Sequence, residues 1–134
     1  MREKVWTATS VKVTSRMSHQ LLHPFSSFEI LQAIKAIGTD VCPRVDGMGR
    51  EFFLTYWDLI ANDLLAAFQE MFSTGIMPQM WKEGLVYLIP KGDVVTDEVK
   101  GWRPITQLNT IYKIYAKLLA LRLQPFLPSI VHAS

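Results

Sequence analysis

Apolar side chains recur every three or four positions in two parts of the chain's first half, which is the period of an amphipathic α-helix. One helix is expected to start at a capping box formed by Ser26 and Glu29 and to end near Gly38. A longer helix is expected from about Glu51 to Gly75, since glycine favours the end of a helix. We expect their apolar faces to form the core, with Phe28, Ile30, Leu31, Ile34 and Ile37 in the first helix and Trp57, Ile60, Leu64, Leu65, Phe68, Met71 and Phe72 in the second.

The spacing of apolar residues changes in the second half of the chain. Residues 85–89 form a short run of strand-favouring side chains that stops at Pro90, and a second extended segment begins at Arg103. The polar connection between them predicts an antiparallel hairpin with a long loop. A last helix is expected from Asn109 to Leu123, and the two prolines after it predict a turn or short helical pieces. This order predicts an α+β fold, with helices packed around a small antiparallel hairpin.

Residues 1–23 show no clear period, so we expect a flexible or weakly extended lead-in before a domain of residues 24–134. Hydrophobic residues make up 49% of the 134 residues, which is typical of a folded chain and not of a disordered one. A single cysteine, Cys42, excludes an intrachain disulfide and a multi-cysteine metal site, and favours a reducing, intracellular compartment, nuclear or cytoplasmic. We identify no secretory signal, and no apolar stretch reaches the roughly 18 residues of a membrane span.

Charge is distributed unevenly, although the net charge is only +2. Residues 1–25 hold four basic and one acidic side chain (+3), residues 26–81 hold three and seven (−4), and residues 82–134 hold seven and four (+3). Segregated charge is common in proteins that bind nucleic acids. An acidic helical middle with solvated faces explains the pattern equally well, so charge alone does not decide the function.

Short motifs in the second half resemble one family of polymerases. Residues 88–93 (LIPKGD) followed by residues 101–105 (GWRPI) are similar to the fingers signature of LINE-type (non-LTR retrotransposon) reverse transcriptases, which group II intron maturases share. Residues 111–114 and 117–123 resemble the helix that follows in that family. The resemblance covers residues 24–131, and it implies the fingers and the start of the palm of an RNA-directed DNA polymerase. Further matches are Asp46-Gly47, Gly75, Pro78 and Trp81.

The resemblance implies a site for the triphosphate of an incoming dNTP. In the family, the lysine after the first strand and the arginine that opens the second close over the phosphates, and these are Lys91 and Arg103 here. A lysine point charge and a planar guanidinium suit such a ligand. On residue chemistry alone, Lys91 could equally be a solvated loop lysine, and Arg103 could pair with Asp93 or Glu98.

The last helix and the strands offer candidates for contacts with nucleic acid. Lys113, Lys117 and Arg122 could meet the phosphate backbone of the RNA template or DNA primer that the family binds, or could simply face solvent. Aromatic side chains near the strands could stack on bases, although such residues are more often part of the core. They are Trp81, Tyr87 and Trp102.

The chemistry of nucleotide addition needs carboxylates that hold two Mg²⁺ ions about 4 Å apart. The resemblance places the first catalytic aspartate beyond Ser134 and an aspartate pair further on, and the chain's aspartates include no adjacent pair. Asp97-Glu98 could be sought as a substitute, but adjacent polar residues on a loop more simply face water. We therefore expect a fragment that has no catalytic residue, binds no metal or cofactor and is inactive alone, although the full-length family uses Mg²⁺.

Two positions depart from the family's pattern. Arg44 stands where the family usually has glycine, and Val41 stands where lysine is common. If that glycine takes a positive φ, arginine there costs on the order of 1 kcal/mol. The departures leave two alternatives open, a decayed retroelement relic and a non-enzymatic helical interaction module. In either case, exposed apolar surface favours self-association.

Overall fold

The computed structural model describes residues 13–39, 46–93 and 97–131. Helices and one antiparallel pair of strands make up these residues, which confirms the predicted α+β class. The elements in chain order are α1 (Ser15–Leu22), α2 (Ser27–Ala36), α3 (Arg50–Thr55), α4 (Trp57–Thr74), α5 (Gln79–Lys82), β1 (Gly84–Pro90), η1 (Val99–Gly101), β2 (Trp102–Leu108), α6 (Thr110–Leu123), η2 (Gln124–Phe126) and α7 (Leu127–Ile130).

The helices pack on one another and form a helical layer with its own core. Helix α2 lies against α6 and also contacts α3 and α4, so segments from both halves of the chain meet there. Phe68 of α4 is fully buried, with its ring centroid 5.2 Å from that of Tyr115 and 6.2 Å from that of Trp81. The buried apolar side chains are Phe25, Ile30, Ala33, Ile34, Phe53, Leu64, Phe68, Met71, Ile111, Ile114 and Leu118.

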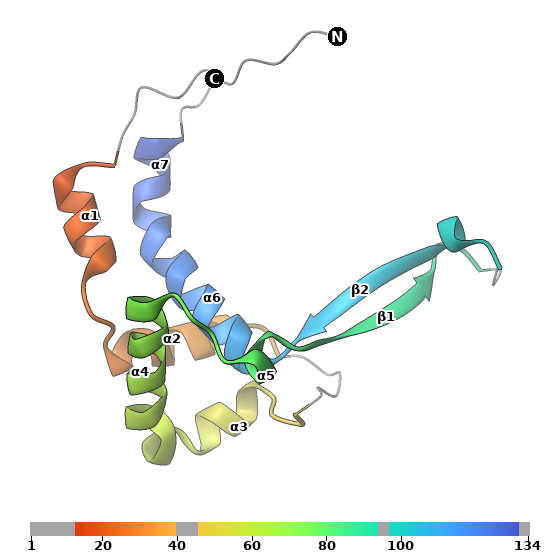
Figure 1. Cartoon of the computed structure of the whole chain (residues 1–134), viewed down its shortest axis with the longest axis horizontal. Helices are drawn as coiled ribbons and strands as arrows, with labels where there is room; N and C mark the ends of the chain where they lie inside the picture. The colour runs from red at the N-terminus through yellow and green to blue at the C-terminus, as the bar shows by residue number, and fades with distance from the viewer. Residues whose placement is uncertain (1–12, 40–45, 94–96, 132–134) are drawn as a thin grey trace, which may run out of the picture.

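Residues 84–93 and 97–108, which include both strands, form an arm that projects away from the helical layer (Figure 1). Gly84 is paired with Leu108 at the base and Pro90 with Trp102 near the tip. The base is closely packed, because a Cβ on Gly84 would lie 3.0 Å from the carbonyl oxygen of Gln107. The helices pack on one another beside the base of the hairpin. The strands alternate apolar side chains onto both faces, and within the described residues no helix runs along the length of either face.

Residues 15–22 form a helix in a segment that we expected to be flexible or extended. Thr14 caps α1, since its Oγ1 accepts a hydrogen bond from the Met17 N–H at 3.2 Å. Helix α1 has no buried residue, so it carries no core-facing apolar stripe from which its period could be detected. Residues 1–12 lie outside the described residues.

The capping box at the start of α2 is confirmed. Ser26 Oγ accepts from the Glu29 N–H at 3.2 Å, and Glu29 Oε2 accepts from the Ser26 N–H at 2.9 Å. The other end differs from the prediction, because α2 stops at Ala36 and not at Gly38. Phe28 was expected in the core but is 68% exposed, since the buried side of α2 is formed by Ile30, Ala33 and Ile34.

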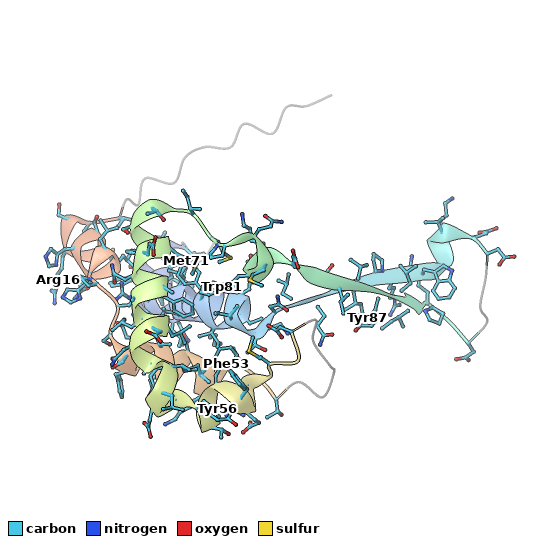
Figure 2. The ribbon with its side chains drawn as sticks, turned by 60° about the horizontal axis from the view of Figure 1, so that its bottom comes forward. Arg16, Phe53, Tyr56, Met71, Trp81 and Tyr87 are labelled. Atoms are coloured by element: carbon cyan, nitrogen blue, oxygen red, sulfur yellow. The ribbon has the colours of Figure 1, made fainter. Side chains whose placement is uncertain are left out.

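The long second helix is interrupted. Tyr56, with φ −100° and ψ 15°, separates α3 from α4, although the apolar period runs through the break. Phe53 of α3 and Met71 of α4 both lie within the helical layer (Figure 2). The predicted end of the helix is confirmed, because Gly75 takes φ +69°, a conformation that favours glycine.

Helix α6 begins where the sequence predicted, but for another reason. Asn109 occupies the cap position without a side-chain capping bond, and its Nδ2 instead donates to the Met80 carbonyl at 2.9 Å. Thr110 is fully buried, and its Oγ1 donates to the Met48 carbonyl at 2.6 Å. Long-range contacts, not a local cap, therefore fix the start of α6. The prolines beyond Leu123 lie in η2 and α7, as expected of short helical pieces.

Candidate nucleotide site and basic groove

Lys91 and Arg103 lie near the tip of the arm. The strand register pairs Ile89 with Arg103, and the Lys91 N–H donates to the Gly101 carbonyl at 2.8 Å, which continues the same register by one pair. Residues directly opposite in an antiparallel pair project to the same face, and every second residue returns to that face. Lys91 and Arg103 are therefore diagonal neighbours on one face, about 7–8 Å apart at their backbones.

Both side chains are exposed. Within the described residues, neither makes a side-chain hydrogen bond or an ion pair, and the alternative pairing of Arg103 with Asp93 or Glu98 is not formed. Two neighbouring cations on one face repel each other unless an anion neutralises them. The two charges lie on one exposed face, where a single multivalent anion could neutralise both.

Apolar side chains extend this face toward the base of the arm. Tyr87 and Ile105 lie opposite each other, and they are 42% and 48% exposed. Of the three aromatic candidates for base stacking, Tyr87 lies on the arm, away from the helical layer (Figure 2). Trp81 instead packs against Phe68 in the core, and Trp102 lies half-buried opposite Pro90 on the other face of the arm.

Lys113 and Lys117 stand one turn apart on α6 and line a shared groove of about 540 Å³. The groove is lined by residues of α6 and of the end of α2, and by Leu108 at the base of the arm. Its lining includes small residues, which are Ala36, Gly38, Ala116 and Ala120. Leu108 and Arg103 are five residue steps apart, which corresponds to roughly 17 Å of strand. The groove and the pair at the tip are therefore separate sites.

Arg122, the third predicted phosphate contact, lies in a different environment. Its Nε and Nη2 donate to the two carboxylate oxygens of Glu29 at 2.8 and 3.1 Å. Nη1 donates to the carbonyls of Leu21 and His23, and Nη2 also donates to the carbonyl of Pro24 at 3.0 Å.

These contacts use all five N–H donors that a guanidinium has. The guanidinium carbon also lies 4.4 Å above the centre of the Phe25 ring, and the side chain is only 10% exposed. The prediction that Arg122 contacts nucleic acid gains no support from this geometry, because a phosphate would have to replace an existing bond. We therefore assign Arg122 a structural role, in which it ties α6 to the start of α2.

Glu29 holds the centre of this cluster. Partial burial would raise the pKa of Glu29, but the hydrogen bonds from Arg122 and Ser26 and the positive charge of Arg122 outweigh it and hold the pKa below its ordinary value. Sequence reasoning identified Glu29 as a capping residue and missed its pairing with Arg122. No local sequence pattern indicates this pairing, because the two residues are 93 positions apart.

The loop that the family resemblance marked at Asp46-Gly47 packs against the start of α6. Asp46 Oδ1 accepts from the Met48 N–H at 3.0 Å, and Gly47 takes φ +69°. The carbonyl of Met48 then receives the bond from Thr110. The two departures from the family's pattern, Val41 and Arg44, lie outside the described residues, as does Cys42.

Carboxylates do not gather anywhere in the described ranges. No group of three or more His, Cys, Asp or Glu side chains there could hold a metal ion. Asp58 and Asp63 are exposed on α4, and Asp97 and Glu98 lie exposed near the tip of the arm. These donors do not fit the paired Mg²⁺ ions of a polymerase. No helix in the described part of the chain has the length and apolar character to span a membrane.

Comparison with known proteins adds one finding. The chain is 34% identical, over 131 residues, to the transposon TX1 uncharacterized 149 kDa protein of Xenopus laevis. It is similar to a transposon protein. The match covers 97% of this chain, so the helical layer and the arm are both included, but only 10% of the transposon protein. No protein-family model matches the chain.

Proposed function

We propose that this chain is part of the RNA-directed DNA polymerase of a retrotransposon and that its arm binds the triphosphate of a dNTP. The observation that carries the proposal is the placement of Lys91 and Arg103 on one face at the tip of the arm, both exposed. The similarity to a transposon protein over almost the whole chain supports a mobile-element origin. The resemblance of residues 88–93 and 101–105 to the fingers signature supports this class of enzyme.

The two side chains favour a triphosphate over smaller phosphates. Arg103 can grip two oxygens of one phosphate through its planar fork, while Lys91 adds a point charge a few ångströms away. A ligand must span the distance between the two groups to benefit from both. Each charge-assisted contact contributes roughly 1.5–3 kcal/mol, so we expect dissociation constants in the high micromolar to millimolar range. The base should matter little, because both contacts are to phosphate.

The groove on α6 is the proposed site for nucleic acid. Lys113 and Lys117 share a face, and the small side chains beside them leave space for a sugar–phosphate backbone. Such contacts would hold an RNA template or a DNA primer without reading its sequence, and salt would weaken them. Arg122 is not included, because the fold uses its donors.

Binding is proposed for this chain, and synthesis is not. In the full-length family Mg²⁺ carries the phosphoryl transfer, and the carboxylates described above do not fit such a site. The purified chain should therefore show no template-directed DNA synthesis with Mg²⁺ or Mn²⁺. Robust primer extension by the clean protein would contradict this.

The experiment that tests the proposal is a titration of dNTP against dNMP, followed by chemical-shift change. The triphosphate should bind more tightly, and Lys91→Ala should weaken its binding. Arg103→Lys should also weaken it despite the conserved charge, because lysine lacks the two-donor fork. Lys100→Ala is the matched control, since Lys100 is also exposed near the tip and its loss changes the net charge equally. Equal affinity for both nucleotides, or equal losses in Lys91→Ala and Lys100→Ala, would show that only general charge attraction acts here.

The exposed apolar faces of the arm favour a second candidate, a non-enzymatic interaction module. Side chains of β1 such as Val86 and Leu88 are mostly exposed. This candidate predicts binding to a protein surface with no response to nucleotides. A titration in which dNTP leaves every resonance unchanged would favour it over the polymerase fragment.

A further inference from the structure

Each strand of the arm has one edge that is not paired with the other strand. In an antiparallel ladder, hydrogen-bonded pairs alternate with non-hydrogen-bonded pairs. The bond from Lys91 to Gly101 makes that pair hydrogen-bonded, so residues 85, 87 and 89 of β1 also face β2. The backbone N–H and C=O groups of Val86 and Leu88 therefore point away from β2, as does the N–H of Gly84.

The outer edge of β2 is much less suited to pairing. By the same alternation, Trp102, Pro104 and Thr106 carry the outward groups of this strand. Pro104 has no N–H, and the N–H of Trp102 donates to the Val99 carbonyl. The edge of β1 has no such interruption between Gly84 and Leu88, and β1 contains no charged residue that would discourage pairing.

We propose that the outer edge of β1 pairs with β1 of a second copy of this chain. The two strands run antiparallel about a two-fold axis at Tyr87, which joins two arms into one four-stranded sheet. In this register Val86 and Leu88 of one copy exchange backbone hydrogen bonds with Leu88 and Val86 of the other. The Gly84 N–H donates to the Pro90 carbonyl of the second copy, whereas the Gly84 carbonyl gains no donor there, because Pro90 has no N–H.

Charge complementarity favours a second copy of this chain as the partner of β1. It also favours the register with Tyr87 at the axis. With Tyr87 at the axis, Glu83 of each copy lies opposite Lys91 of the other, at both ends of the paired strands. Glu83 has an extended backbone and continues the line of β1, and both side chains are exposed. Between these ion pairs, Leu85 lies opposite Ile89 of the second copy on the same face. A shift of one copy by two residues places Glu83 opposite Ile89 and loses both ion pairs.

The proposed pairing also limits association to two copies. A contact in which the same edge serves both partners is closed by its two-fold axis. The remaining edges of the four-stranded sheet belong to β2, where Pro104 and Trp102 block further addition. One seven-residue edge is small compared with a standard protein interface, so we expect a dimer that dissociates on dilution. The pairing requires no nucleotide, but it engages Lys91, so a second copy and a triphosphate would compete for this side chain.

A charge exchange in the full chain tests the proposal. Sedimentation velocity should show a monomer–dimer equilibrium, and Glu83→Lys should weaken the dimer by about tenfold, because lysine then faces Lys91 at both ends. The double variant Glu83→Lys, Lys91→Glu should restore the affinity, although each single change weakens it. A chain that stays monomeric at all concentrations, or a double variant no better than either single one, would overturn the proposal.

Cysteine cross-linking tests the register separately from the affinity. In a Cys42→Ala background, Tyr87→Cys should form a disulfide between two copies under mild oxidation, because the two side chains meet at the axis. Ile105→Cys is the matched control, since Ile105 lies on the same face with similar exposure but on the far strand. Cross-linking of Tyr87→Cys at least tenfold faster than Ile105→Cys supports the pairing. Equal rates, or faster linking through Val86→Cys, would contradict it.

Discussion

The helical layer and the arm use equally apolar residues in opposite ways. Phe68 and Ile34 are fully buried among the helices, whereas Leu88 is 62% exposed on the arm. The layer holds its own core because α2, α4 and α6 cover one another. The arm has two apolar faces and only two strands, and such a hairpin is marginally stable alone. An apolar sequence therefore indicates that a segment will be covered, but not whether the cover belongs to the same chain.

Truncation of one large side chain in each region should give the largest difference in the free energy of unfolding. Phe68→Ala should lower the free energy of unfolding by about 3–5 kcal/mol, because it leaves a cavity between Trp81 and Tyr115. Leu88→Ala removes a side chain of the arm that is mostly in water, and should cost less than about 1 kcal/mol. Chemical denaturation followed by circular dichroism measures both. Similar losses in the two variants would mean that the arm contributes to a shared core.

Removal of one guanidinium from each region should give the next largest difference in stability. Arg122→Ala should cost about 2–3 kcal/mol, because Glu29 and the carbonyls before α2 lose their donors. Arg103→Ala changes the net charge equally, but should alter stability by no more than about 0.5 kcal/mol, since Arg103 is exposed on the arm. Thermal unfolding of the two variants, side by side, tests this. A neutral Arg122→Ala would remove the structural role that we assign to it.

A smaller effect is expected from backbone conformation within the helical layer. Gly75→Ala should destabilise the fold by about 1 kcal/mol, because Gly75 ends α4 at φ +69°. Gly38→Ala is the matched control, since Gly38 has no positive φ and open space around its Cα. Urea unfolding should show a lower midpoint for Gly75→Ala only. A loss of equal size at Gly38 would show that the left-handed conformation of Gly75 is not the cause of the destabilisation.

The smallest predicted effect is a dependence of stability on pH that arises from Glu29 in the helical layer. The pKa of Glu29 is lowered in the folded chain, so its ionised form stabilises the fold at neutral pH. This contribution is present above the pKa of the unfolded chain and is lost as the pH falls through the folded value. Unfolding measured from neutral to acid pH should show a shallower decline in Glu29→Gln than in the wild type. An identical decline would mean that other carboxylates determine acid stability.

Sequence predicted those features whose causes lie within a few residues. The capping box of Ser26 and Glu29, the end of α4 at Gly75 and the two strands were all identified from local patterns. The role of Arg122 was not, because its partners Glu29 and Leu21 are 93 and 101 positions away in the sequence. Helix α1 escaped detection because it buries no side chain. For the candidate site, motifs indicated Lys91 and Arg103, but only the strand register shows that they share a face.

The most direct test of the account is where a nucleotide binds. Residue-resolved chemical shifts of the wild-type chain should be recorded during titration with a dNTP. We predict that the largest changes fall on the amides around Lys91, Gly101 and Arg103, while the core around Phe68 and the cluster around Arg122 stay unchanged. Changes confined to the helical layer, or spread evenly over all exposed lysines, would contradict the assignment of triphosphate binding to the arm.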